Sequence, residues 1–117
     1  MITRVNIQQK EELLHWKTRV EKVKDYVTEN LAGALDASSV AREMKLTPFT
    51  LQSVFKKYEG ETFRQYVEKV RMEKAFQLLA EGKWVKEVVV ATGYKYRATF
   101  EKVFKRRYNY PASYFKK

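Results

Sequence analysis

One segment of this sequence occurs twice, and the repeat limits the folds that are open to the chain. Residues 40–46 match residues 88–94 at an offset of 48, and residues 51–57 match residues 100–106 at an offset of 49. The later copy therefore has one extra residue between its two parts. Each copy has the pattern of a short helix, a tight turn and a longer helix that ends in a basic pair. This arrangement predicts a helix-turn-helix, whose second helix can lie in a DNA major groove.

Apolar residues recur at helical spacing along the whole chain. Asp36, Thr62 and the Thr47-Pro48 pair are good helix starts, and glycines follow several predicted helix ends. Four Gly and two Pro leave little room for the many turns of a sandwich or barrel. The sequence therefore predicts an all-α fold of about seven helices: two helix-turn-helix subdomains joined by a long connecting helix. The predicted boundaries are one domain over 1–117, a first helix-turn-helix at 36–60, a connecting helix at 62–81 and a second helix-turn-helix at 85–108.

Two helices have a defined inward face in this pattern. A first helix, ended by Gly33, is expected to bury Leu13, Trp16, Val20, Val23 and Val27. The connecting helix, over about 63–80, is expected to bury Phe63, Tyr66, Val67, Val70, Ala75, Leu78 and Leu79. The β-branched run 88–90 favours a strand by propensity alone. We predict a helix there because no partner strand is available and the flanking pattern is helical.

The chain is strongly basic, with 24 Lys and Arg against 14 Asp and Glu, a net charge of +10 and a pI near 9.8. Residues 95–117 carry eight cations and one anion, which is +7 of that total. Aromatic and apolar residues interleave these cations at helical spacing, so the cations are expected on a folded amphipathic helix. The charge predicts a polyanionic partner. The alternative is a solvated basic face that binds nothing.

Several function classes are disfavoured by composition. The sequence has no Cys, which excludes disulfides, thiolate metal sites and a cysteine nucleophile. His15 is the one histidine, so a His-clustered metal site or a His-dependent triad is hard to build. We therefore expect no enzyme activity, no metal and no cofactor. No apolar run approaches about eighteen residues and no signal peptide follows Met1, so we expect no membrane span and a cytoplasmic, nucleoid-associated protein.

A set of residues then follows a known family pattern in order and at near-family spacing. The matching residues are Phe55-Lys56-Lys57, Gly60 and Tyr66; Arg71, Ala75, Leu78 and Leu79, as R-x-x-x-A-x-x-L-L; and Gly93-Tyr94, Phe100, Phe104-Lys105 and the ending from Pro111 to Tyr114. Over about residues 17–115 the chain resembles the DNA-binding domain of the AraC/XylS transcription regulators. The resemblance implies double-stranded DNA as a partner and transcription regulation as the role, with RNA polymerase as a further partner.

The sequence departs from the family pattern at a few positions. Asn109 stands where Gly is usual, which is acceptable because Asn tolerates the left-handed conformation. Val89 replaces a usual Ala at the contact between the two helices of the second unit, which predicts a slightly wider separation of these helices. Lys95-Tyr96 is a poor N-cap for the helix that follows.

In the first unit, the predicted recognition helix buries Leu51, Val54 and Phe55, which leaves other residues on its outer face. The resemblance places DNA-base contacts at three of them, Phe49, Gln52 and Ser53. Gln52 can pair with adenine, Ser53 can donate or accept, and Phe49 can pack on a thymine methyl. The alternative for Phe49 is a core aromatic. Lys56 and Lys57, one turn later, suit DNA phosphates.

In the second unit, burial of Phe100, Val103 and Phe104 leaves four candidate base contacts outward: Arg97, Ala98, Glu101 and Lys102. Arg97 suits guanine, and Glu101 can accept a hydrogen bond from cytosine. The alternative for Glu101 is an intrahelical pair with Lys105. The predicted phosphate contacts are Lys105, Arg106 and Arg107.

The connecting helix sets the distance between the two recognition helices. Its eighteen or so residues give about 27 Å, comparable to a DNA turn of about 34 Å. The two recognition helices can then enter successive major grooves on one face of the duplex. Arg71 lies in this helix, and an ion pair with Glu68 or a neighbouring acid is favoured over a DNA contact for it.

The residues before Asp36 are too few for a ligand-binding or dimerisation domain. The chain is thus expected to be either a small stand-alone regulator, acting as a monomer on an asymmetric site, or the excised domain of a longer one. Activation and repression both stay open. A rival reading is an architectural or RNA-binding protein that is indifferent to sequence. Its charge fits, but it does not need two turn-spaced helices with mixed polar outer faces.

Overall fold

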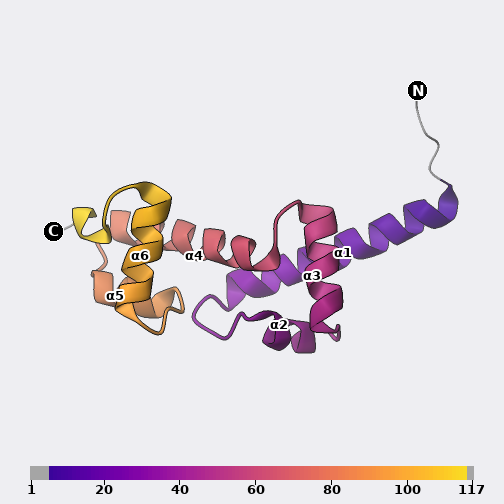
Figure 1. Ribbon diagram of the computed structural model, residues 1–117, viewed down its shortest axis with the longest axis horizontal. Helices are drawn as coiled ribbons and strands as arrows, with labels where there is room; N and C mark the ends of the chain where they lie inside the picture. The colour runs from indigo at the N-terminus through magenta and orange to yellow at the C-terminus, as the bar shows by residue number, and fades with distance from the viewer. Residues whose placement is uncertain (1–5, 116–117) are drawn as a thin grey trace, which may run out of the picture.

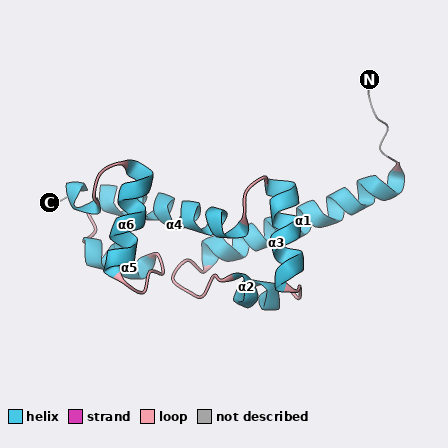
Figure 2. Ribbon diagram, viewed as in Figure 1, coloured by secondary structure: helices cyan, strands magenta, loops and turns pink. Residues whose placement is uncertain are grey.

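The computed structural model describes residues 6–115, which form six α-helices and a final 3-10 helix (Figure 1). In chain order these are α1 (Ile7–Glu29), α2 (Ala37–Glu43), α3 (Pro48–Glu59), α4 (Phe63–Ala80), α5 (Val85–Ala91), α6 (Arg97–Tyr108) and η1 (Ala112–Phe115). Residues 6–115 contain no strand (Figure 2), so the all-α prediction is confirmed. The run 88–90 lies within α5, as predicted. The basic Lys116 and Lys117 lie outside the described residues.

The helices α3 and α4 begin at the capping residues that the sequence predicts. At the start of α3, the Thr47 side chain accepts a hydrogen bond from the Thr50 N–H at 3.1 Å. At the start of α4, the Thr62 hydroxyl accepts from the Gln65 N–H at 3.1 Å, and Gln65 Oε1 accepts from the Thr62 N–H at 3.0 Å. This reciprocal capping box satisfies two backbone donors that the helix itself leaves free.

Only the second half of α1 contributes to the core. Val20, Val23 and Val27 are buried, as predicted, because they face α3. Leu13 is 41% exposed, so its assignment to the buried face is wrong. Figure 1 gives the reason: the N-terminal half of α1 extends past α3 and away from the other described helices.

The buried residues form two separate hydrophobic cores, and α4 contributes to both. One half of α4 supplies Phe63, Tyr66 and Val67 to a first core with α1, α2 and α3. The other half supplies Met72, Ala75 and Leu79 to a second core with α5, α6 and η1. Met72 is fully buried although the periodicity did not predict it on the inward face. Each helix-turn-helix thus has its own core, and α4 joins them.

This division places the two longer helices of the units at opposite ends of α4. Figure 1 shows α3 and α6 running in the same direction, with α4 crossing between them. The described chain is correspondingly elongated, with extents of 57 × 35 × 20 Å. Within the described residues, no helix is both long enough and apolar enough to cross a bilayer.

Candidate nucleic-acid interface

The outer face of α3 is open to solvent. Leu51 and Phe55 fix its orientation, because both point into the first core and are nearly or fully buried. Phe49 on the other face is 79% exposed, which excludes the core-aromatic alternative for this residue. Gln52 and Ser53 are exposed beside it. The structure therefore brings the three predicted base-contact residues of this unit together on one accessible face.

The two lysines at the end of α3 have weak partners within the chain. Lys56 Nζ donates to the Gly60 carbonyl at 3.3 Å, and Lys57 Nζ lies 5.3 Å from the centre of the Tyr58 ring. Both side chains are exposed. Contacts of this kind on the surface are small in free energy, so both ammonium groups stay available to an anion.

The outer face of α6 is accessible along most of its length. Phe100 and Phe104 are fully buried in the second core, which turns Arg97, Ala98 and Lys102 toward solvent. The helix begins at Tyr96, which makes no side-chain capping hydrogen bond, in agreement with the poor cap predicted there. Lys105 and Arg107 are also exposed near the end of the helix.

Glu101 is less accessible than the other predicted contacts on α6. It is half-buried, and its Oε1 atom is buried without a hydrogen-bond partner in the described part of the chain. No ion pair joins it to Lys105, so the structure does not contain the alternative intrahelical pair. A buried carboxylate oxygen without a donor carries a desolvation cost.

The two outer faces have the same register. The repeat equates Phe49 with Ala98, Gln52 with Glu101, and Ser53 with Lys102, at the offset of 49 seen in the sequence. It also equates Lys56 and Lys57 with Lys105 and Arg106. In both helices the first set lies in the first two turns, and the cations lie in the later part. Two helices that were oriented independently by their cores thus present corresponding surfaces.

Arg106 and Arg71 have partners that the sequence did not predict. Arg106 Nη2 on α6 forms a short ion pair with Glu68 Oε1 on α4. Arg71 does not pair with Glu68, contrary to the prediction, and its Nη2 instead donates to the Gly33 carbonyl at 3.0 Å. Periodicity along one helix could not reveal either contact, because each partner lies 38 residues away.

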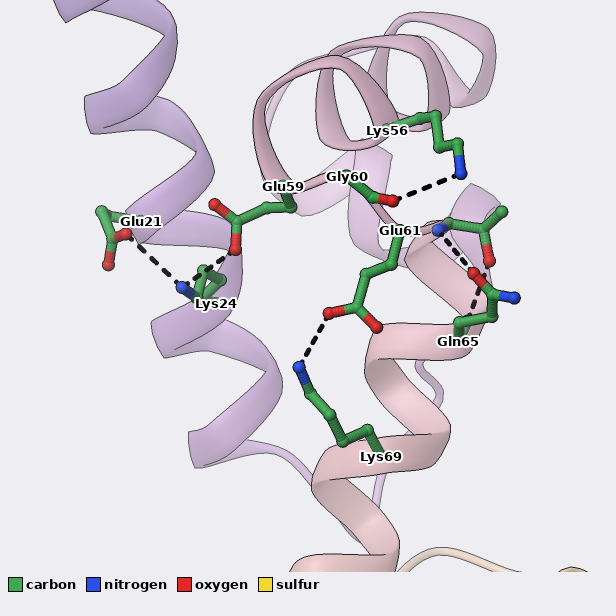
Figure 3. A network of polar contacts seen from close by, with 9 residues as sticks. Glu21, Lys24, Lys56, Glu59, Gly60, Glu61, Gln65 and Lys69 are labelled. Carbon is green, nitrogen blue, oxygen red and sulfur yellow. Dashed lines mark hydrogen bonds and ion pairs between the residues drawn. The ribbon is translucent and has the colours of Figure 1, made fainter. Parts of the chain in front are cut away.

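A second unpredicted feature is a polar network that fastens α1 to the first unit. Figure 3 shows Lys24 between Glu21 and Glu59, with Lys24 Nζ 3.0 Å from Glu59 and 3.6 Å from Glu21. The hydrogen bond to Glu59 raises the pKa of Lys24 above its usual value. Arg19 Nη2 donates to the Met44 carbonyl at 2.8 Å, which ties α1 to the end of α2 as well. The second half of α1 is thus held by polar contacts to α3 and to the end of α2.

A cleft of about 500 Å³ separates the two units on the side where α3 and α6 approach α4. Its lining includes Gln52 from α3, Arg64 from α4 and Thr99 from α6. Arg64, which the sequence did not indicate as a contact residue, is exposed one residue after the start of α4. The one feature of the sequence that could have indicated Arg64 is its positive charge in the first turn of the connecting helix. Residues 6–115 contain no cluster of three His, Cys, Asp or Glu that could hold a metal ion.

Comparisons with known proteins agree with this geometry. Residues 40–117 match a family model described as a helix-turn-helix domain. The chain is 29% identical over 92 residues to the regulatory protein PocR of Salmonella typhimurium, covering 78% of this chain and 30% of PocR. The chain thus spans about three-tenths of the length of the curated relatives that it matches.

Solved structures share the fold. The C-terminal domain of AraT, a response regulator from Geobacillus stearothermophilus, superimposes with a TM-score of 0.79 at 25% identity, over 83% of this chain and 82% of that domain. The DNA-binding domain of the global transcriptional factor AdpA, solved with a target DNA, gives a TM-score of 0.77 at 19% identity, over 83% of this chain and 88% of that chain. The second likeness concerns the fold alone.

Proposed function

This chain belongs to the AraC-type family of helix-turn-helix DNA-binding domains of transcription regulators, and we propose that it binds a specific two-part site on double-stranded DNA. In this proposal α3 enters one major groove and α6 enters the next, on the same face of the duplex. Control of transcription then follows from occupancy of the site, with RNA polymerase as the protein partner. The bacterial nucleoid is the corresponding location.

One observation gives the proposal its main support. Burial of apolar residues in the two cores leaves corresponding residues of α3 and α6 exposed to solvent. Phe49, Gln52 and Ser53 are exposed on α3, and their counterparts Ala98 and Lys102 are exposed on α6. A protein that only neutralised DNA charge would not need matched outer faces with amide, hydroxyl and aromatic groups. Such groups are the ones that read base edges in the major groove.

The proposal assigns base contacts to the outward residues in the first turns of each recognition helix. In α3, Gln52 pairs with an adenine, Ser53 contacts a neighbouring base, and Phe49 packs on a thymine methyl. In α6, Arg97 pairs with a guanine and Glu101 accepts from a cytosine amino group, with Ala98 and Lys102 completing the base-contacting face. For this contact the Glu101 carboxylate would turn outward, because its Oε1 atom is buried in the DNA-free chain.

The later turns of both helices carry the phosphate contacts in this proposal. They are Lys56 and Lys57 on α3, and Lys105, Arg106 and Arg107 on α6. The ion pair with Glu68 leaves the Arg106 side chain 61% exposed, so the guanidinium can also meet a phosphate. The α4 helix has 18 residues, which correspond to about 27 Å. That length suits two helices in successive grooves, about 34 Å apart.

Selection of bound sequences from random duplex DNA tests the proposal. We expect an enriched site with two conserved parts, and a footprint with two protected patches about one helical turn apart on one face. The chain with Lys86→Ala serves as a matched control, because Lys86 is an exposed cation on α5, outside both recognition helices. This variant should select the same site. Binding without enrichment would favour the architectural alternative instead.

The salt dependence of binding gives an independent measure. If six to eight phosphates are neutralised, the slope of log affinity against log salt should be about −5 to −7. A slope shallower than about −2 would mean that the basic surface does not face the DNA. A single short protected patch would mean that only one of the two units docks.

A further inference from the structure

The boundary between the two cores falls at one residue of α4. Val70 packs against the first core and Met72 lies fully buried in the second. Arg71 lies between them and is half-buried. Its side chain lies between the two cores. Contacts of this side chain can therefore join the two units in addition to α4 itself.

The Arg71 guanidinium contacts both units. Its Nη2 donates to the Gly33 carbonyl, at 3.0 Å, in the loop that leads into the first helix-turn-helix. Its central carbon lies 5.7 Å from the centre of the Tyr94 ring, in the turn of the second helix-turn-helix. The planar guanidinium can do both at once, because it donates hydrogen bonds in its plane and attracts an aromatic ring over its face. A lysine ammonium in the same place lacks this geometry.

The same two loops also approach each other directly. A Cβ placed on Gly93 would lie 2.2 Å from the Leu31 carbonyl oxygen and 2.7 Å from Arg71 Nη2. No ordinary side chain fits into that space, so the loop at 31–33, the turn at 93–94 and Arg71 form one closely packed junction. The junction is defined here as Leu31, Gly33, Arg71, Gly93 and Tyr94.

We propose that Arg71 is a positioning residue that fixes how the second helix-turn-helix is oriented relative to the first, and with it the spacing between the two DNA parts that the chain accepts. The part of this inference that concerns DNA rests on the function proposed above. A connecting helix alone can bend and twist. When a side chain of that helix also contacts both units, the helix cannot change its direction without breaking one of these contacts. The Arg106–Glu68 ion pair adds a weaker brace on the exposed surface.

Substitution with methionine separates positioning from folding. Arg71→Met keeps a long side chain on α4 but removes the hydrogen bond to Gly33 and the attraction to the Tyr94 ring. It also removes the Arg71 Nε group, which is buried without a hydrogen-bond partner and therefore carries a desolvation cost. Removal of this cost partly offsets the loss of the two contacts. Arg71→Lys keeps the charge and removes the planar group. Arg42→Met is the matched control, because it makes the same change at an exposed arginine on α2, outside the junction, the cleft and both recognition helices.

The first measurement needs no DNA. The chain has no Cys, so Lys22→Cys on α1 and Lys86→Cys on α5 accept one spin label each at exposed positions in different units. We expect one narrow distribution of label distances in the parent chain and in Arg42→Met. Arg71→Met should broaden or shift the distribution, and Arg71→Lys should give a smaller change. A distribution that is the same in Arg71→Met and the parent, with helical content unchanged, would overturn the inference.

The second measurement uses the selected DNA site, with one base pair inserted or removed between its parts. Each change rotates one part by about 34° relative to the other. We expect the parent chain to lose about tenfold or more in affinity, and Arg71→Met to lose less than about threefold. Each variant should bind an isolated half-site like the parent. Equal spacing discrimination in Arg71→Met and the parent would overturn the inference. Absence of a two-part site would instead contradict the proposed function, and the label distances would still decide the role of Arg71.

Discussion

The two helix-turn-helix units place the same backbone conformations at equivalent positions but use different residues there. The turn after α2 has Lys45 at a φ of 58°, and the equivalent turn after α5 has Gly93 at 83°. At the ends of α3 and α6 the choice is reversed, with Gly60 at 77° and Asn109 at 66°. The left-handed conformation is thus required by the motif. Of the two glycines at these four positions, Gly93 is required by packing, because the Leu31 carbonyl leaves no room for a Cβ, whereas Gly60 has open space.

The units also differ in how their helices begin. In the first unit the side chains of Asp36 and Thr47 cap α2 and α3. In the second unit the equivalent residues Trp84 and Tyr96 make no side-chain capping hydrogen bond. The first unit therefore depends more on local hydrogen bonds for its helix ends.

The core of the second unit contains the larger aromatic cluster. The Phe104 ring lies 4.7 Å from Tyr108, 6.1 Å from Tyr110 and 6.3 Å from Phe115, measured between ring centres. Aromatic pairs at these distances stabilise beyond the area that they bury. The first core also has aromatic pairs, between Phe55 and the rings of Phe63 and Tyr66. Both units are therefore held by tertiary packing, and the first adds side-chain caps to it. Four experiments test this comparison.

The largest effect is expected at the two turns. Gly93→Ala should destabilise the chain by about 2–4 kcal/mol, because it adds left-handed strain and a clash with the Leu31 carbonyl. Lys45→Gly should change stability by no more than about 1 kcal/mol, since relief of strain is offset by backbone entropy. Urea unfolding of both variants measures the difference. Equal effects at the two turns would show that the Gly93 contact yields easily.

The next effect concerns DNA and compares the two ends of α6. Arg97→Ala should cost about 1–3 kcal/mol on the selected site and relax preference at one or two base pairs. Lys105→Ala should weaken binding equally on selected and random DNA and flatten the salt slope by about one. Affinities on two duplexes at three salt concentrations separate these outcomes. The reverse assignment would mean that α6 enters the groove from its other end.

Capping gives a smaller effect of opposite sign in the two units. Thr47→Ala removes the acceptor for the Thr50 N–H and should cost about 1 kcal/mol. Tyr96→Ser supplies an acceptor that the second unit lacks and should stabilise by up to about 1 kcal/mol. Thermal unfolding in the absence of DNA measures both. If Tyr96→Ser destabilised the chain as much as Thr47→Ala, packing of the tyrosine ring would outweigh the missing cap.

The smallest effect is a response to acid that is confined to the first unit. Hydrogen bonds from Ser39 lower the pKa of Asp36 below its ordinary value of 3.8. A lowered folded-state pKa means that the stabilisation is present above the ordinary value and is lost as the pH falls through the folded value. The protection of the α2 amides, measured relative to the unfolded chain at the same pH, should therefore fall in acid more than that of the α5 amides, because α5 has no acidic N-cap. In Asp36→Asn this difference should largely disappear.

The helices and the outward faces could be predicted because they depend on local patterns. Thr47 and Thr62 mark helix starts by their own chemistry, and Phe55 and Phe104 fix helix faces by their spacing. Whether the outward residues contact bases stays a prediction. The predicted separation of the second unit's helices by Val89 also stays a prediction, although Val89 itself is buried.

The contacts between units could not be predicted from such patterns. Along the sequence, Arg71 has one acid a helical turn away, Glu68, and Arg106 has none. Their actual partners depend on how the two cores are placed along α4. Leu13 follows the apolar period of α1, but no described helix lies opposite it. In each case the missing information is the position of a second element, which neither spacing nor propensity contains.

The sharing of α4 has a consequence for how the protein unfolds. Val67 on this helix is buried with the first core, and Met72, little more than a turn later, is buried with the second. Unfolding of either core would remove the packing that keeps the corresponding half of α4 helical. That half of the helix would then unfold as far as the other core. We therefore expect the two units to unfold together in one cooperative transition.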